Sequence, residues 1–202
     1  RLAALDMAFA LSQSGLIVCT RGGYGLTRLL PQAPWVDWAS RLNRYEHLLC
    51  GHSDITALQL ALLNAGASPS GLLHGPMVCF DFGAPEGPHG TTLHHFELAA
   101  FANQVDVVWG FADSAGFGRL GLGSSPAVYE GPVWGGNLSV LSSMVGTPHL
   151  PIVDGGLLIL EDINEPWYKV ERMLLQLGQA GVLAKQQALI LGDWGQSKPN
   201  SQ

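Results

Sequence analysis

Two short apolar runs that each stop at a glycine turn constrain the fold of the first third of this 202-residue chain. One run covers residues 16–20 and leads into a glycine-rich loop at 21–25, and the other covers residues 47–50. Short apolar runs that end at turn residues are typical of buried strands, and helical spacing at 54–64 follows the second one. Alternating strands and helices predict a parallel, doubly wound α/β sheet, with both turns at its carboxyl edge, where such folds place their sites.

The second turn carries a serine, in Gly51-His52-Ser53. A serine on a strand-to-helix turn projects its hydroxyl above the sheet, beside backbone N–H groups that have no helical partner. Such groups can stabilise an oxyanion, so the turn predicts acyl transfer with Ser53 as nucleophile. The pattern departs from a full G-x-S-x-G elbow, because Asp54 and Ile55 follow the serine. An ordinary connection between a strand and a helix is therefore the alternative.

The loop at 21–25 has three glycines in four residues, which lets its backbone approach a ligand or a neighbouring loop closely. A phosphate cradle is one use, but no Gly-Lys-Ser/Thr follows, which argues against a P-loop. The other use is an amide that faces an oxyanion. Arg21 and Tyr24 could bind a substrate carboxylate or only hold the loop, since an arginine fork suits a free carboxylate.

Glu161 ends a predicted strand at 157–160, where a carboxylate is usually solvated or caps the next helix. Asp162 and Glu165 are the better cap candidates, because they lie closer to Pro166, the expected first helical residue. Glu161 is thereby left without an obvious structural task, which keeps a functional role open. Asn137 could bind substrate, but its position after Gly136 favours a helix cap.

The seven histidines give no clear base or metal site. His52 should point away from the Ser53 hydroxyl and pack, because neighbouring side chains on an extended chain diverge. His74, before Gly75-Pro76, is interpreted as a hydrogen-bond donor that anchors a loop. Adjacent His94 and His95 lack the spacing to other ligands that a metal site needs.

Composition narrows the class of protein. The net charge of −6 argues against nucleic acid or an anionic membrane surface as partner. No run approaches the roughly 20 apolar residues of a membrane span. Cys19, Cys50 and Cys79 lie within apolar runs, which predicts reduced core thiols and a cytosolic protein.

Shifts in composition predict two domains. We place a nucleophile-bearing domain at 1–82, a connector at 83–125 and a second domain at 126–202. The individual elements expected besides those above are helices at 1–12, 26–30, 93–103, 137–145 and 167–177, and strands at 77–80, 127–129 and 188–191.

Five segments, in chain order, resemble the L,D-carboxypeptidases, which are serine peptidases that trim the stem peptides of peptidoglycan. The segments are 21–25 with 28–31, 51–58, 74–76, 135–138 with 146–148, and 160–166 with Tyr168, Arg172 and Leu174. As a set they are far more specific than any one of them. The resemblance implies a flavodoxin-like parallel-sheet domain followed by a smaller α/β domain of the swivelling β/α type, both truncated.

The resemblance also implies a Ser-His-Glu triad, in which Ser53 is the nucleophile and Glu161 orients the histidine. The backbone N–H groups of Gly23 and Asp54 would form the oxyanion hole. The family's histidine lies in a Gly-His pair after the carboxylate, whereas no histidine follows His149 here. We therefore expect an internal fragment, cut at both ends and inactive alone.

The implied reaction is removal of the terminal D-alanine from peptidoglycan tetrapeptides during murein recycling in the cytoplasm. It requires no metal or organic cofactor, and the family suggests a homodimer. A related immunity-type serine peptidase, which cleaves a peptide–nucleotide antibiotic, is one alternative. A binding paralogue that kept the fold and lost the chemistry is another.

Overall fold

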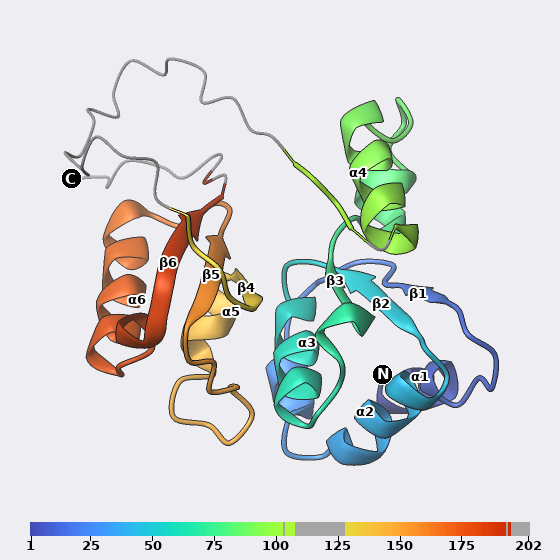
Figure 1. The fold of residues 1–202 in the computed structure, drawn as a ribbon, viewed down its shortest axis with the longest axis horizontal. Coiled ribbons are helices and arrows are strands. Elements are labelled where there is room, and N and C mark those ends of the chain that lie inside the picture. Colours follow the sequence, from blue (N-terminus) through green and yellow to red (C-terminus); the bar gives the residue numbers. More distant parts are fainter. Residues whose placement is uncertain (103, 108–127, 193, 195–202) are drawn as a thin grey trace.

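The first half of the protein is built on a three-stranded parallel sheet, in a computed structural model that describes residues 1–102, 104–107, 128–192 and 194 (Figure 1). Strands β1 (Leu16–Val18), β2 (Leu48–Gly51) and β3 (Leu72–His74) lie side by side in chain order. Parallel pairing sets Gly51 opposite His74. Helix α1 (Leu2–Phe9) precedes β1. Helices α2 (Trp35–Arg44) and α3 (Ile55–Asn64) and the 3-10 turns at Leu26–Leu29 and Pro69–Gly71 connect the strands.

The second half repeats this plan with its own parallel sheet. Strands β4 (Val133–Asn137), β5 (Gly156–Glu161) and β6 (Gln186–Leu191) are also arranged in chain order. Asn137 and Glu161 are register partners at the carboxyl ends of β4 and β5. Helices α5 (Leu138–Ser143) and α6 (Trp167–Gln179) and a 3-10 turn at Leu183–Lys185 belong to this half. The expected parallel α/β fold is confirmed in both halves.

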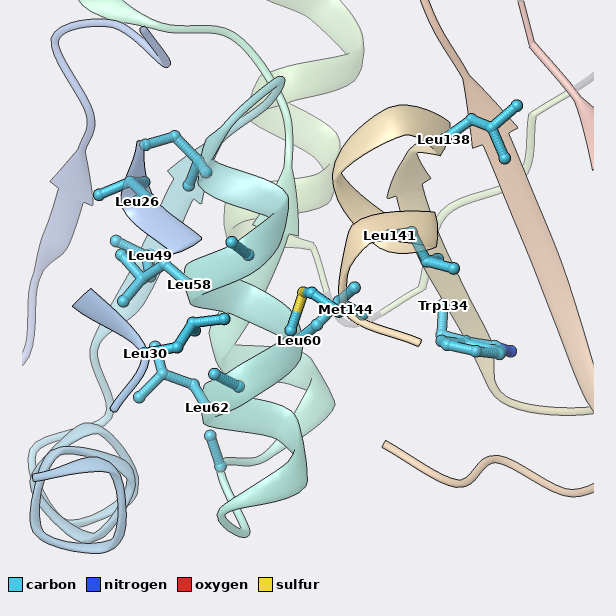
Figure 2. Packing of buried hydrophobic residues seen from close by; sticks show 14 of the residues in the cluster. Leu26, Leu30, Leu49, Leu58, Leu60, Leu62, Trp134, Leu138, Leu141 and Met144 are labelled. Atoms are coloured by element: carbon cyan, nitrogen blue, oxygen red, sulfur yellow. The ribbon is translucent and has the colours of Figure 1, made fainter. Parts of the chain in front are cut away.

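Helix α3 lies between the two sheets and joins the halves (Figure 1). Its sequence is apolar on nearly every side, and residues 55–62 are all buried, as expected of a helix packed on all faces. Figure 2 shows Leu58 of α3 beside Leu49 of β2, whereas Leu60 lies beside Met144 at the end of α5. These side chains belong to one buried cluster, which includes Trp134 and Leu141 of the second half. The two halves therefore pack against each other through α3.

Helix α4 (Gly90–Phe101) stands apart from both sheets, and Phe96 is its one buried residue. It falls inside the expected connector at 83–125, of which residues 103 and 108–125 lie outside the described residues. The boundaries placed after residues 82 and 125 stay predictions. No helix in the described ranges is long and apolar enough to cross a membrane.

Two expected strands are wrong. Residues Val78–Phe82 form a π-helical turn instead of a strand, and strand β3 lies earlier, at Leu72–His74. Val78 and Phe80 are exposed, so their apolar character does not mark a buried strand. The strand expected at 127–129 is also absent at Val128 and Tyr129, which are exposed, while Ala127 lies outside the described residues.

Helix α2 was not expected, although its sequence carries a helical signal. Its buried side chains Trp38, Ala39 and Leu42 share one face, and Asp37 and Arg41 form an ion pair at 2.6 Å on the other side. The cysteines also differ from expectation: Cys50 is buried and Cys19 partly buried, but Cys79 is exposed and is not a core thiol.

Candidate active site

Ser53 occupies a strained turn between β2 and α3. Its φ is 61°, in the left-handed region that residues with a side chain seldom adopt. Such conformations persist only where the surrounding structure holds them, and they are common at functional sites. Helix α3 starts at Ile55, two residues later, so the serine stands at its N-terminal end. This is the local geometry of a nucleophile elbow, despite the absent second glycine.

The glycine-rich loop packs directly against this turn. A Cβ added to Gly22 would lie 2.9 Å from Ser53 Cβ and 3.1 Å from the Asp54 nitrogen. The buried Asp54 carboxylate accepts a hydrogen bond from the Leu26 backbone at 2.8 Å, which ties the loop to the turn. Burial raises the pKa of Asp54, while the Leu26 N–H and the charge of Arg1 oppose this rise. Gly22 is the residue of the loop that contacts the serine turn. Gly23, the expected oxyanion donor, follows with a φ of 82° and is exposed.

Glu161, at the end of β5, faces the first half from the second sheet. Its Oε1 atom lies 3.6 Å from Nε2 of His74, the last residue of β3. Oε1 has no contact with solvent and accepts no hydrogen bond from any described residue. Burial and the neighbouring Asp162 raise the pKa of Glu161, whereas His52 and the Asn137 amide lower it. Buried acceptors without a donor are rare in folded proteins, so this oxygen calls for an explanation other than the packing of the fold.

Two histidines link Glu161 to the serine turn. The rings of His74 and His52 are 6.2 Å apart, edge to face, and His52 immediately precedes Ser53. His52 Nε2 also lies 3.3 Å from Asp81 Oδ2. His52 therefore makes a polar contact as well as packing, and His74 does not simply anchor a loop. Burial, helped by His52, lowers the pKa of His74 to about 4, although a third of its side chain is exposed.

The side chain of Asn137 makes its hydrogen bonds within the second half. Its side-chain oxygen accepts from Val140 N at 3.1 Å and caps α5, the interpretation that the sequence favoured. Its amide donates to Asp162 Oδ1 at 3.1 Å, and its backbone N–H donates to Thr56 Oγ1 of α3 at 3.1 Å. This last bond joins the serine helix to the end of β4.

Asp162 and Glu165 do not cap α6, which begins after Pro166 without a side-chain cap. Asp162 instead accepts from Ser139 N at 2.8 Å, so it supports the start of α5. Glu165 pairs with Lys169 at 3.3 Å. The expected cap is wrong for Asp162 because its carboxylate accepts a hydrogen bond at the start of α5, a helix distant in sequence.

Arg21 and Tyr24 lie exposed on the glycine-rich loop. The guanidinium of Arg28 stacks over the Tyr24 ring at 4.9 Å from its centre, and Arg1 donates to the Tyr24 carbonyl at 2.9 Å. These contacts fix the loop and leave both polar ends accessible. A substrate-binding role for either residue stays a prediction.

Comparison with known proteins identifies the family. The family model described as LD-carboxypeptidase N-terminal domain matches residues 1–71, and the one described as LD-carboxypeptidase C-terminal domain matches residues 130–202. This chain belongs to the LD-carboxypeptidase family. It is 33% identical over 198 residues to the murein tetrapeptide carboxypeptidase of Pseudomonas aeruginosa, a match that covers 96% of this chain and 60% of that protein.

Solved structures agree with this assignment. The muramoyltetrapeptide carboxypeptidase from Oxalobacter formigenes matches with a TM-score of 0.82 and 36% identity, over 100% of this chain and 62% of that one. The microcin C7 self-immunity protein MccF shares the fold, with a TM-score of 0.69 at 23% identity over 95% of this chain and 60% of that one. The chain spans about three fifths of the length of these relatives.

The candidate site contains residues to which the sequence analysis assigned no role in the site. Thr56 and His74 bridge the two halves, and Asp162 supports Asn137. Thr56 had a signal, because it lies one helical turn after Ser53, and His74 had one in its place before Gly75-Pro76. Within the described ranges, no cluster of three or more histidine, cysteine or acidic side chains could hold a metal ion.

Proposed function

We propose that this protein is a serine L,D-carboxypeptidase that removes the terminal D-alanine from murein tetrapeptides. The observation that carries the proposal is the left-handed turn at Ser53, packed against Gly22. Membership of the family, and the names of the relatives from Pseudomonas and Oxalobacter, support the same reaction and substrate class.

In this mechanism Ser53 Oγ attacks the carbonyl carbon before the terminal D-alanine, and its proton passes to an imidazole base. Backbone N–H groups at Asp54 and in the 22–23 turn stabilise the oxyanion. D-alanine leaves with that proton, and water then hydrolyses the acyl-enzyme. Glu161 orients the imidazole and stabilises its charged form. The imidazole is the one member of the triad for which we name no residue.

The test is release of D-alanine from a murein tetrapeptide by the full-length gene product. Ser53→Ala should lower kcat by on the order of a thousandfold or more, since loss of a triad nucleophile has effects of this size or larger. Ser143→Ala is the matched control, because Ser143 is exposed and its hydroxyl donates to Val140 O and to no other described residue. D-alanine release that survives Ser53→Ala would refute the assignment of the nucleophile.

The fold likeness to MccF keeps an immunity-type peptidase as a second candidate. Assaying a peptide–nucleotide conjugate beside the murein tetrapeptide separates the two, because each candidate cleaves only one of these substrates efficiently. A protein that binds the tetrapeptide without cleaving it would be the non-catalytic paralogue. Cytoplasmic location and a homodimer remain predictions.

A further inference from the structure

His74 occupies the point at which the ends of the two sheets meet. It ends β3, opposite Gly51 of β2, and its ring lies against Gly136 of β4. A Cβ at Gly136 would be 3.1 Å from Nδ1 and Cε1 of His74, so only glycine leaves room for this ring. The opposite ring nitrogen, Nε2, is directed to Glu161 Oε1 at 3.6 Å.

The groups around this pair define its electrostatics. His52 faces His74 from the serine turn, and Asp81 contacts the far side of His52. Asp162, the residue directly after β5, disfavours the charged form of Glu161. No described residue donates a hydrogen bond to Glu161 Oε1, although a hydrogen bond from the Asn137 amide to this carboxyl group lowers its pKa. Nε2 of the His74 ring, at 3.6 Å, lies just beyond hydrogen-bond distance of this buried oxygen.

We infer that His74 is a positioning residue for Glu161, with the proton of a neutral imidazole on Nε2 directed at Oε1. This inference rests on the proposed function, in which Glu161 must be ionised and held in one orientation. A carboxylate oxygen has room for two donors, so His74 and the imidazole base can share it.

A neutral donor suits this task better than a charged one. A hydrogen bond to the charged form favours the carboxylate and offsets part of the effect of burial. A protonated His74 would instead compete with the imidazolium that forms during catalysis. Burial keeps the pKa of His74 at about 4, so the ring is neutral at neutral pH.

The test follows the titration of the Glu161 carboxyl by carbon-13 NMR in the full-length gene product. His74→Phe keeps an aromatic ring against Gly136 but removes the donor, and should raise the Glu161 pKa by about one unit. The acidic limb of the pH profile of kcat/KM should move in the same direction. His74→Gln, which retains an N–H near the place of Nε2, should restore at least half of the shift. His149→Gln, outside the site, should change neither.

A Glu161 pKa that is the same in His74→Phe and wild type would overturn the inference, whatever happens to the melting temperature. If that variant does not fold, the nitrogen-15 spectrum of wild type decides, because a proton on Nδ1 at neutral pH contradicts the proposal. The NMR titration needs no turnover. If His74→Phe shifts the Glu161 pKa but the wild-type protein releases no D-alanine, the proposed function is refuted and the inferred contact stands.

Discussion

The backbone of Gly22 lies against the side chain of Ser53, so closely that a Cβ at residue 22 would stand 2.9 Å from Ser53 Cβ. The same added atom would lie 3.1 Å from the Asp54 nitrogen and the His52 carbonyl oxygen. These neighbours are backbone and a short side chain, which cannot swing away. The glycine-rich loop and the serine turn therefore determine each other's position.

Gly22→Ala should displace the serine turn. Crowding of this kind typically costs about 1–3 kcal/mol of stability. A shift of the oxyanion donors should lower kcat by roughly a hundredfold, the effect of losing one such donor. Urea denaturation and D-alanine release measure the two effects.

Gly90→Ala is the control for this change. A Cβ at Gly90, the first residue of α4, would meet no atom within 4 Å. Its stability and kcat should stay close to wild type. Equal behaviour of the two variants would show that the loop yields to the added methyl group.

Thr56→Val should remove a hydrogen bond between the two halves while keeping the shape of the side chain. The variant leaves the buried Asn137 N–H without its acceptor, which costs about 1–3 kcal/mol. The free energy of unfolding from urea denaturation should fall by that amount.

Thr56→Ser retains the hydroxyl and loses only a methyl group. It should keep more of the wild-type stability than Thr56→Val, although its smaller side chain leaves a void. A serine variant that is less stable than the valine variant would mean that packing, and not the hydrogen bond to Asn137, gives Thr56 its importance.

Glu161→Gln should abolish activity and stabilise the fold at neutral pH. Burial and Asp162 raise the pKa of Glu161 above its ordinary value of 4.5, so the folded state binds this proton more tightly than the unfolded chain. Stability contributed by Glu161 therefore falls as the pH rises from 4.5 through the folded pKa, and neutral glutamine avoids that cost.

The stabilisation should disappear below pH 4.5, where Glu161 is protonated in both states. Melting temperatures across this range give the measurement. Exposed Glu97→Gln serves as the control and should show no such dependence. A Glu161→Gln protein less stable than wild type at neutral pH would mean that the carboxylate makes contacts that outweigh its burial.

The sequence predicted those features that local patterns determine. The turn at Ser53 follows from an apolar strand, a glycine and an apolar helix in succession, and the cap at Asn137 follows from its place after Gly136. Helix α6 lies where a helix is predicted at 167–177, and it buries Val170, Met173 and Leu177 on one face.

The features that were missed depend on neighbours distant in sequence. His74 contacts Glu161 of the second sheet. Asp162 accepts hydrogen bonds from Asn137 and Ser139 instead of capping the helix that follows it. Strand β3 is three residues long and only partly buried, whereas Val78 and Phe80 carry the stronger apolar signal on an exposed turn. Local strand propensity could not show which of these two segments forms the strand, because packing against β2 and the second sheet decides this.

The three thiols should differ sharply in reactivity. Burial raises the pKa of Cys19 to about 11 and that of Cys50 to about 12, and Cys50 Sγ donates to the Pro76 carbonyl at 3.3 Å. Because the thiolate is the nucleophile, both should resist iodoacetamide at mildly alkaline pH, while exposed Cys79 reacts. Mass spectrometry of the native protein should find one adduct, Cys79→Ser should give none, and denaturant should expose the rest. Rapid labelling of native Cys79→Ser would show that β2, or the chain just after β1, opens readily, and that the first sheet is less stable than its burial indicates.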